Sequence, residues 1–253
     1  MHRAMPIVTL TSDFGASDHY VAAMKAAVLK NCPHARLIDV THQIPRHDIL
    51  RGSIVLERAI DGFPPGTVHL AVVDPGVGTQ RRIIVVKIKR QFVVCPDNGL
   101  ITWAWRSRSG AKAFELTWRP KKASNTFHGR DVLGPVAGKI ASDARIGSLA
   151  RNNVKPILLD IAPSKTRQGQ IIYFDHFGNA MTNIGEGLLG KIKFKNVLVH
   201  GKKLGKLKRT YGDVAPGVPL ALIGSSGLLE IAVRDGNAAK QLKLKVGDRI
   251  RLD

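Results

Sequence analysis

Apolar runs rich in β-branched residues recur along the first part of the chain and predict buried strands. These runs cover residues 7–10, 37–38, 67–73, 82–89 and 91–95. Stretches with the period of an amphipathic helix occupy residues 18–31, 48–60, a short segment near 100–105 and a segment within 130–143. Asp18 stands where it can cap the first of these helices. The alternation predicts an α/β N-terminal domain with a mainly parallel, buried sheet.

From about residue 157 the pattern changes to short strand-like runs separated by glycine. The runs cover residues 170–174, 181–184, 196–200, 220–223, 228–233 and 246–252, and no long helical period interrupts them. This pattern predicts a smaller all-β, barrel-like C-terminal domain. The domain boundary is expected within residues 152–167, which contain Pro156 and Pro163, so we divide the chain into residues 1–156 and 157–253.

Aspartates stand at or just after the ends of several predicted strands. They are Asp13, Asp39, Asp74 and Asp97, in a chain with 19 acidic residues. Any one of them is explained by the preference of aspartate for the start of a loop. Together they favour a polar small-molecule site, because the carboxyl ends of parallel strands meet at one edge of a sheet. The turn after Asp74 also brings a cation, Arg81, close to it in sequence.

Two other patterns carry little functional signal. The turn Gly76-Val77-Gly78 has neither the third glycine of a dinucleotide fingerprint nor the Gly-Lys-Ser/Thr of a P-loop. A second group, His34, His42 and His47 with Asp39 and Asp48, matches no standard metal-ligand spacing. We expect no metal site, and assign these histidines to surface or helix-capping positions.

Three further segments are candidates for a ligand site. His128, in the segment Phe127–Asp131, opens a predicted helix, whose N-terminus disfavours the imidazolium form. On its own it is as compatible with an exposed capping histidine as with a catalytic one. In the second domain, Asp175–Asn179 and Ser225–Glu230 combine an aromatic ring, an amide and hydroxyls, which suits a heteroaromatic ligand. Each of these two segments alone is also compatible with a barrel corner.

Charge and cysteine content limit the remaining classes of function. The net charge is +20 over 253 residues, with the densest basic cluster at 191–208 and few aromatics within it. No nucleic-acid-binding motif accompanies it, so a solvated surface is favoured over a specific nucleic-acid footprint. The two cysteines, Cys32 and Cys95, form no disulfide framework, and no signal peptide or membrane-spanning run is visible. We therefore expect a cytoplasmic protein without a membrane partner.

Five motifs in a fixed order identify a family resemblance that spans nearly the whole chain. They are Thr11–Gly15, Val72–Thr79, Phe127–Asp131, Phe177–Asn179 and Leu229–Val233. This combination resembles the S-adenosylmethionine hydroxide adenosyltransferases, the hydrolase relatives of fluorinase and chlorinase. The resemblance implies a catalytic α/β domain, a ligand-binding β-barrel-like domain, and a homotrimer with its site between subunits. It also implies that no cofactor is needed, since S-adenosylmethionine (SAM) is the substrate.

The resemblance assigns roles to individual residues. The hydrolytic trio corresponds to Asp74, Arg81 and His128. The substrate-binding positions correspond to Asp13 for the ribose hydroxyls, Asp175 for the methionine ammonium, Phe177 and Asn179 for the nucleoside, and Ser225, Ser226, Glu230 and Val233 in the C-terminal ligand segment. Gly224 and Arg234 depart from the asparagines that relatives often carry.

The implied reaction is attack of water or hydroxide on the ribose C5′ of SAM, releasing adenosine and L-methionine. The family suggests the (R)-sulfonium epimer as the substrate. Because the sulfur leaves as a neutral thioether, the leaving group needs no general acid. The catalytic residues are instead needed to orient and activate the attacking water or hydroxide. Two alternatives remain: a SAM-dependent halogenase, which would carry an additional N-terminal loop and lack the charged trio, and a noncatalytic nucleoside- or nucleic-acid-binding protein, suggested by the positive charge.

Overall fold

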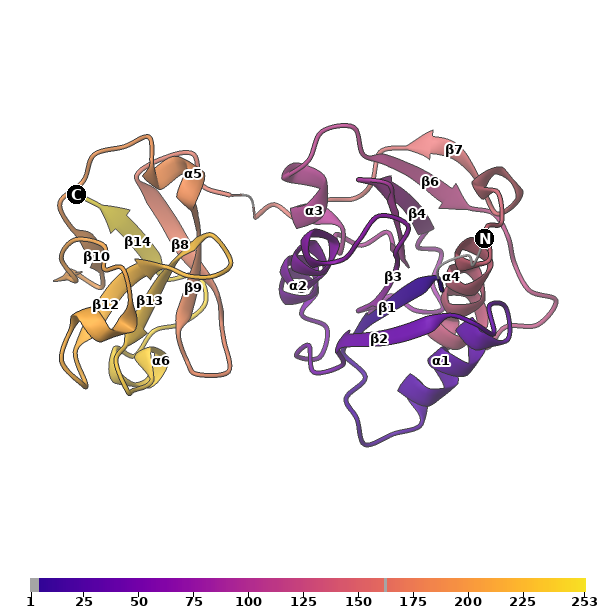
Figure 1. Ribbon diagram of the computed structural model, residues 1–253, viewed down its shortest axis with the longest axis horizontal. Helices are drawn as coiled ribbons and strands as arrows, with labels where there is room; N and C mark the ends of the chain where they lie inside the picture. Colours follow the sequence, from indigo (N-terminus) through magenta and orange to yellow (C-terminus); the bar gives the residue numbers. More distant parts are fainter. Residues whose placement is uncertain (1–4, 162) are drawn as a thin grey trace. The chain divides into compact units, whose positions relative to one another are not determined.

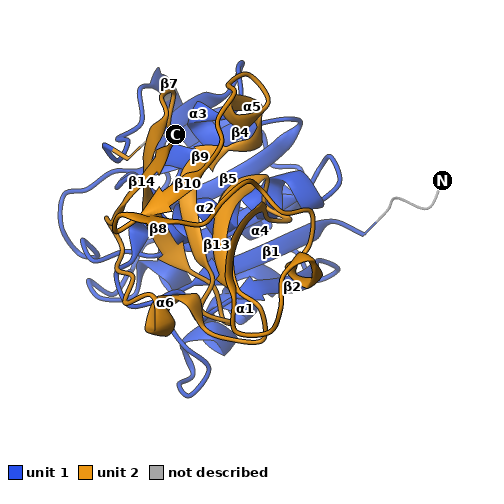
Figure 2. Cartoon of the chain, turned by 90° about the vertical axis from the view of Figure 1, so that its left-hand side faces the viewer, with its two compact units in different colours: residues 1–160 blue, residues 161–253 orange. Residues whose placement is uncertain are grey.

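The computed structural model describes residues 5–161 and 163–253. Contacts divide the chain into two compact units, Met1–Asp160 and Ile161–Asp253, coloured separately in Figure 2. Residue 162, which falls within the predicted boundary segment, lies outside the described residues.

The first unit is built on a seven-stranded mixed sheet with strand order β2-β1-β3-β5-β4-β6-β7. Its strands are β1 (Ile7–Ser12), β2 (Arg36–Thr41), β3 (Val68–Val72), β4 (Ile83–Ile88), β5 (Gln91–Pro96), β6 (Lys112–Leu116) and β7 (Ala150–Val154). Strands β2, β1, β3 and β5 pair in parallel, whereas β4, β6 and β7 continue the sheet through antiparallel pairs. The predicted α/β class is confirmed; β6 and β7 were missed.

Helices cover both faces of this sheet (Figure 1). They are α1 (Tyr20–Leu29), α2 (Ile49–Gly62), α3 (Thr102–Arg106) and α4 (Gly134–Ala141), the last continuing from a π-helical turn at Gly129–Leu133. A 3₁₀ turn at Ile146–Ser148 precedes β7. Strand β3 is buried on both sides: Leu70 packs in the core beneath α1 and α4, and Ala71 packs in the core beneath α2 and α3. Double-sided burial explains why its sequence is continuously apolar.

Helix capping differs between the two long helices. Asp48 caps α2 as an N-terminal carboxylate should, its side chain accepting a hydrogen bond from Arg51 N at 2.8 Å. The prediction for Asp18 is wrong, because α1 begins after His19, with no side-chain cap. Asp18 instead lines the pocket described below.

The second unit is a single antiparallel sheet with strand order β11-β10-β14-β8-β9-β13-β12. Its elements are β8 (Gln168–Phe174), β9 (Ala180–Gly185), α5 (Glu186–Leu189), β10 (Val197–Val199), β11 (Lys202–Lys203), a 3₁₀ turn (Tyr211–Asp213), β12 (Pro219–Ile223), β13 (Leu228–Val233), α6 (Ala238–Gln241) and β14 (Arg249–Leu252). The predicted all-β C-terminal class is confirmed. No helix among the described residues of either unit is long and apolar enough to cross a membrane.

Candidate active site

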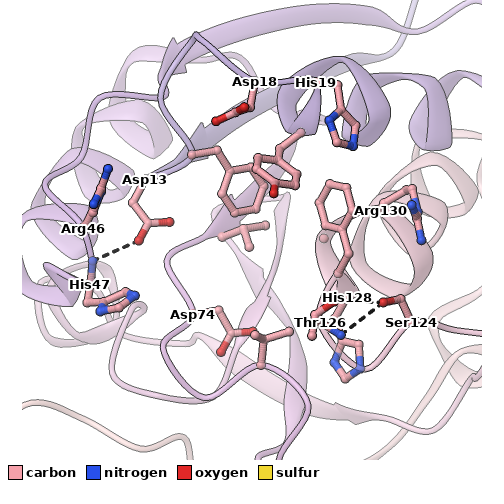
Figure 3. Close-up of a pocket in the computed structure, with 16 residues that line it drawn as sticks. Asp13, Asp18, His19, Arg46, His47, Asp74, Ser124, Thr126, His128 and Arg130 are labelled. Carbon is pink, nitrogen blue, oxygen red and sulfur yellow. Dashed lines mark hydrogen bonds between the residues drawn. The ribbon is translucent and has the colours of Figure 1, made fainter.

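A pocket of about 560 Å³ opens in the first unit where the loops after β1, β2 and β3 meet the turn that starts α4 (Figure 3). Parallel strands carry their ligand sites at this edge, because loops from neighbouring strands converge there. The lining residues are Asp13, Phe14, Asp18, His19, Tyr20, Arg46, His47, Val72, Asp74, Val77, Ser124, Thr126, Phe127, His128, Gly129 and Arg130.

The predicted trio is assembled at this pocket. Arg81 Nε lies 2.6 Å from Asp74 Oδ1 and 2.8 Å from Oδ2, and its Nη2 also donates to Oδ2. The same Nη2 lies 3.1 Å from His128 Nδ1. The side chains of Arg81 and Asp74 are only 10% and 5% exposed, so their geometry is fixed by packing as well as charge. Asp74 and His128 face the pocket, with Arg81 linking them.

The tautomer of His128 follows from this contact. A guanidinium group has only donors, so the Nδ1 that it approaches must be the acceptor nitrogen of a neutral imidazole. The ring proton is then on Nε2. Burial lowers the pKa of His128, the positive charge of Arg81 lowers it further, and Asp74 opposes them. The site therefore favours neutral His128 with an Nε2–H donor.

Asp13 forms a second polar wall of the pocket, apart from Asp74 (Figure 3). Its Oδ2 accepts a hydrogen bond from His47 N at 2.9 Å. The other two strand-end aspartates do not contribute: Asp39 pairs with Lys25 and His42, and Asp97 is buried, where it pairs with Arg82 and accepts from Ile157 N. Only part of the expected aspartate rim therefore belongs to the site.

An aromatic cluster beside Asp13 was missed by sequence reasoning. The rings of Phe14, Tyr20 and Phe127 lie 5.2–5.9 Å apart between centroids. Arg130 stacks over Phe127 at 4.9 Å. The sequence does contain one indication of these rings, because two of them are next to predicted site residues: Phe14 follows Asp13, and Phe127 precedes His128. These rings give the pocket an apolar wall suited to a nucleoside or a thioether chain.

In the second unit, Asp175 organises the loop between β8 and β9. Its Oδ1 accepts from Phe177 N at 2.9 Å and Asn179 N at 2.8 Å, and Asn179 Nδ2 donates to Oδ2 at 3.1 Å. The loop turns at Gly178, whose φ is +86°. Phe177 is 73% exposed, an unusual position for a large aromatic ring that makes it available for stacking.

The other C-terminal candidates gather around the turn between β12 and β13. Glu230 is 2% exposed and accepts from Tyr211 Oη at 2.6 Å. Burial raises the pKa of Glu230, the Tyr211 hydrogen bond opposes this, and the nearby charge of Asp175 adds to it. Ser225 is exposed, and Ser226 Oγ is buried with no hydrogen-bond partner among the residues that the structure describes. Val233 instead belongs to the apolar core of this unit.

The histidines set aside above need one correction. His42 does not lie on the surface; it is buried and bonded to Ser12 and Asp39. His34 and His47 are exposed, and His47 borders the pocket. Among the described residues no group of three His, Cys, Asp or Glu side chains is arranged to hold a metal ion.

Comparisons with known proteins agree with the motifs. Family models of the SAM hydroxide adenosyltransferase N-terminal and C-terminal domains match residues 8–150 and 169–251. The (R)-S-adenosyl-L-methionine hydrolase of Thermus thermophilus is 38% identical, over 97% of this chain and 98% of its own. An uncharacterised conserved protein of Thermotoga maritima, 36% identical, superposes with a TM-score of 0.87 over 96% of this chain and 98% of its own. A fluorinase of Actinopolyspora mzabensis is more distant, at 23% identity over 98% of this chain and 97% of its own.

Proposed function

Since the chain belongs to the SAM hydroxide adenosyltransferase family, we propose that it hydrolyses S-adenosyl-L-methionine, as the (R)-sulfonium epimer, to adenosine and L-methionine. The observation that carries the proposal is the contiguous Asp74–Arg81–His128 array at a pocket of suitable size. A water molecule held there can meet an acceptor, Asp74, and a donor, His128 Nε2–H, at once.

In the proposed reaction the water oxygen bonds to C5′ of the ribose while the C5′–S bond breaks. The bonding electron pair moves to the sulfonium, which leaves as the neutral thioether of methionine, and the proton of the water passes to solvent. Asp74 Oδ1 accepts a single hydrogen bond from Arg81, whereas Oδ2 accepts two, so Oδ1 keeps a lone pair that can accept from the attacking water. Positioned proton management of this kind contributes about 10²–10⁴-fold in rate. The reaction needs no metal or cofactor.

Substrate recognition is proposed to divide between polar and apolar groups. Asp13 would accept hydrogen bonds from the ribose hydroxyls, and the Phe14 cluster would contact the apolar parts of the substrate. From the second unit, Asp175 would bind the methionine ammonium and Phe177 would stack on the nucleoside. The remaining C-terminal positions expected to contact substrate are Asn179, Ser225, Ser226 and Glu230; Val233 could do so only through its backbone, because its side chain packs in the core.

We also propose that the protein is a cytoplasmic homotrimer, with N-terminal site residues of one subunit and C-terminal site residues of a neighbour forming each site. A heterologous interface that closes into a ring permits this arrangement. Mixing inactive Asp74→Ala with inactive Asn179→Ala protein should then restore some activity, because mixed trimers contain sites with neither substitution. A fully active monomer in light scattering would rule the arrangement out.

The deciding experiment incubates the purified protein with each SAM epimer and quantifies adenosine and methionine. Adenosine formation above the spontaneous background supports the proposal, and none with either epimer would sink it. Chloride and fluoride are included in a parallel reaction. A 5′-halo-adenosine formed at a rate rivalling that of adenosine would favour halogenation, which the negative charge of Asp74 at the nucleophile position argues against.

A further inference from the structure

Beside the pocket and outside the trio described above, a buried serine and a buried histidine form a hydrogen-bonded chain that ends on a partly exposed aspartate, Asp39. Ser12 Oγ lies 2.7 Å from His42 Nδ1, and His42 Nε2 lies 3.0 Å from Asp39 Oδ1. Lys25 Nζ donates to the second oxygen of Asp39 at 2.6 Å. The connectivity is that of a nucleophile triad, but Ser12 is 0% exposed and cannot reach a substrate.

A β-bulge makes this chain possible. Leu10 pairs with Asp39, but Thr11 pairs with Thr41, so Val40 is an extra residue on β2. In a regular strand, side chains three residues apart point to opposite faces. The extra residue cancels this alternation, so that Asp39 and His42 can bond on one side while His42 comes level with Ser12.

The protonation pattern of the chain follows from its partners. Burial opposes ionisation of Asp39, but hydrogen bonds from Lys25 and His42 outweigh it and lower the pKa of that carboxyl. Ionised Asp39 accepts from His42 Nε2–H, which leaves Nδ1 to accept from the Ser12 hydroxyl. Ser12 Oγ in turn accepts from Phe14 N at 3.4 Å. The chain thus ends on the backbone of a pocket residue.

Further hydrogen bonds join the loop that follows β1 to the loop that follows β2, on either side of this Ser12–His42–Asp39 chain. Gly15 N donates to His42 O at 2.8 Å, and Ile44 N donates to Ser12 O at 3.3 Å. His47, with a left-handed φ of 63°, then donates its backbone N–H to Asp13. The loop that carries Asp13 is therefore held against the loop that carries His47 by a buried centre, His42.

We propose that His42 is a positioning residue: through Ser12 it fixes the loop of Asp13, so that this carboxylate is held ready for the ribose hydroxyls of the nucleoside. The inference rests on the proposed function for the identity of the ligand. It assigns His42, Ser12 and Asp39 no contact with substrate. A preorganised carboxylate binds more tightly because less freedom is lost on binding.

The same strand offers a matched control. Thr9 Oγ1 lies 2.7 Å from His69 Nδ1, and His69 Nε2 lies 3.1 Å from Gln91 Oε1. This is also a hydroxyl–imidazole–polar chain anchored on β1, but Gln91 ends it on the backbone oxygens of Phe63 and Pro64, which do not line the pocket. Its loss should affect stability and not ligand geometry.

The experiment compares His42→Ala, His42→Asn and His69→Ala in the full chain. Hydrolysis gives KM and kcat, and calorimetry gives the Kd of adenosine and of 2′,3′-dideoxyadenosine. His42→Ala should raise KM about tenfold, the scale of one lost hydrogen bond, with a much smaller change in kcat. It should weaken adenosine about tenfold and dideoxyadenosine little. His42→Asn, which can still bond Ser12, should recover most of the affinity, and His69→Ala should lower Tm without moving either Kd.

Three results would overturn the inference: an unchanged adenosine Kd in His42→Ala, equal weakening of both nucleosides, or a matching loss of affinity in His69→Ala. If His42→Ala does not fold, Ser12→Ala removes a single oxygen and carries the same expectations. The binding readout keeps the two proposals separate. Wild-type protein that binds adenosine but hydrolyses neither SAM epimer would refute the proposed function, while the nucleoside comparison would still decide the role of His42.

Discussion

Replacing Arg81 by lysine asks whether the proposed hydrolytic array depends on the shape of the guanidinium or only on its charge. The structure gives Arg81 two tasks: its Nε and Nη2 grip both oxygens of Asp74, and Nη2 also reaches His128 Nδ1 at 3.1 Å. Lysine keeps the positive charge but offers a single nitrogen on a flexible stem. It cannot hold both partners in the same geometry.

The magnitude follows from the hydrogen bonds that lysine cannot make. One hydrogen bond to a charged group is worth about 1.5–3 kcal/mol. If that stabilisation is expressed in the transition state, at about 1.4 kcal/mol per factor of ten, Arg81→Lys should lower kcat by about 10- to 150-fold. Adenosine makes no use of the nucleophile, so its affinity should hardly change.

The assay is adenosine release for kcat, with calorimetry for adenosine Kd. A matched variant, Arg81→Met, removes the charge as well. Burial and the charge of Arg81 lower the pKa of His128, so Arg81→Met should move the acid limb of the kcat profile to higher pH, while Arg81→Lys should leave it in place. A wild-type kcat in Arg81→Lys, or a loss of adenosine affinity as large as the loss of kcat, would refute the reasoning.

Three further predictions concern stability. Burial lowers the pKa of His69 from 6.5 to about 4; stability should therefore fall, by up to about 3 kcal/mol, as pH drops from 6.5 towards 4, and His69→Gln should flatten this part of a urea-denaturation series. Burial raises the pKa of Glu230, so its stabilising contribution is lost as pH rises, and Glu230→Gln should gain Tm relative to wild type at pH 8 but not at pH 4. Gly78 has a φ of +80° and a Cβ there would overlap Asn125 O, so Gly78→Ala should cost about 1–3 kcal/mol and lower kcat by separating the Asp74 and His128 loops; unchanged kcat and melting would contradict this.

The sequence pattern predicted strands best where burial is double-sided. Strand β3 reads as one apolar run because both faces are covered, and its end marks Asp74 within a residue or two. Strands β6 and β7 lie at the antiparallel edge of the sheet, where runs such as Lys112–Leu116 mix charged and apolar residues. Such edge strands are defined by their partners more than by their own pattern, so periodicity alone did not reveal them.

Site residues were predictable to the extent that they sit at strand ends or in distinctive motifs. Asp13 and Asp74 meet both conditions, His128 meets the second, and all three line the pocket. Tyr20 is the first residue of α1, a helix whose pattern indicates only core packing, yet its ring faces the pocket beside Phe127. The periodic pattern of a helix identifies the side that packs on the core, and it does not indicate which residue also faces a pocket.

The misassigned His42 marks a more general limit. It was assigned to the surface because its group matches no metal-ligand spacing, and its spacing of three residues from Asp39 would in an unbroken strand place the two side chains on opposite faces. Val40 changes this alternation because it is inserted into the strand pairing without a partner. A single apolar residue in the sequence does not indicate a bulge. Bulges commonly lie next to functional sites, where they re-aim side chains. The same irregularity that breaks the two-residue alternation of β2 lets the buried imidazole of His42 bond both Asp39 on its own strand and Ser12 at the end of the neighbouring strand, next to Asp13.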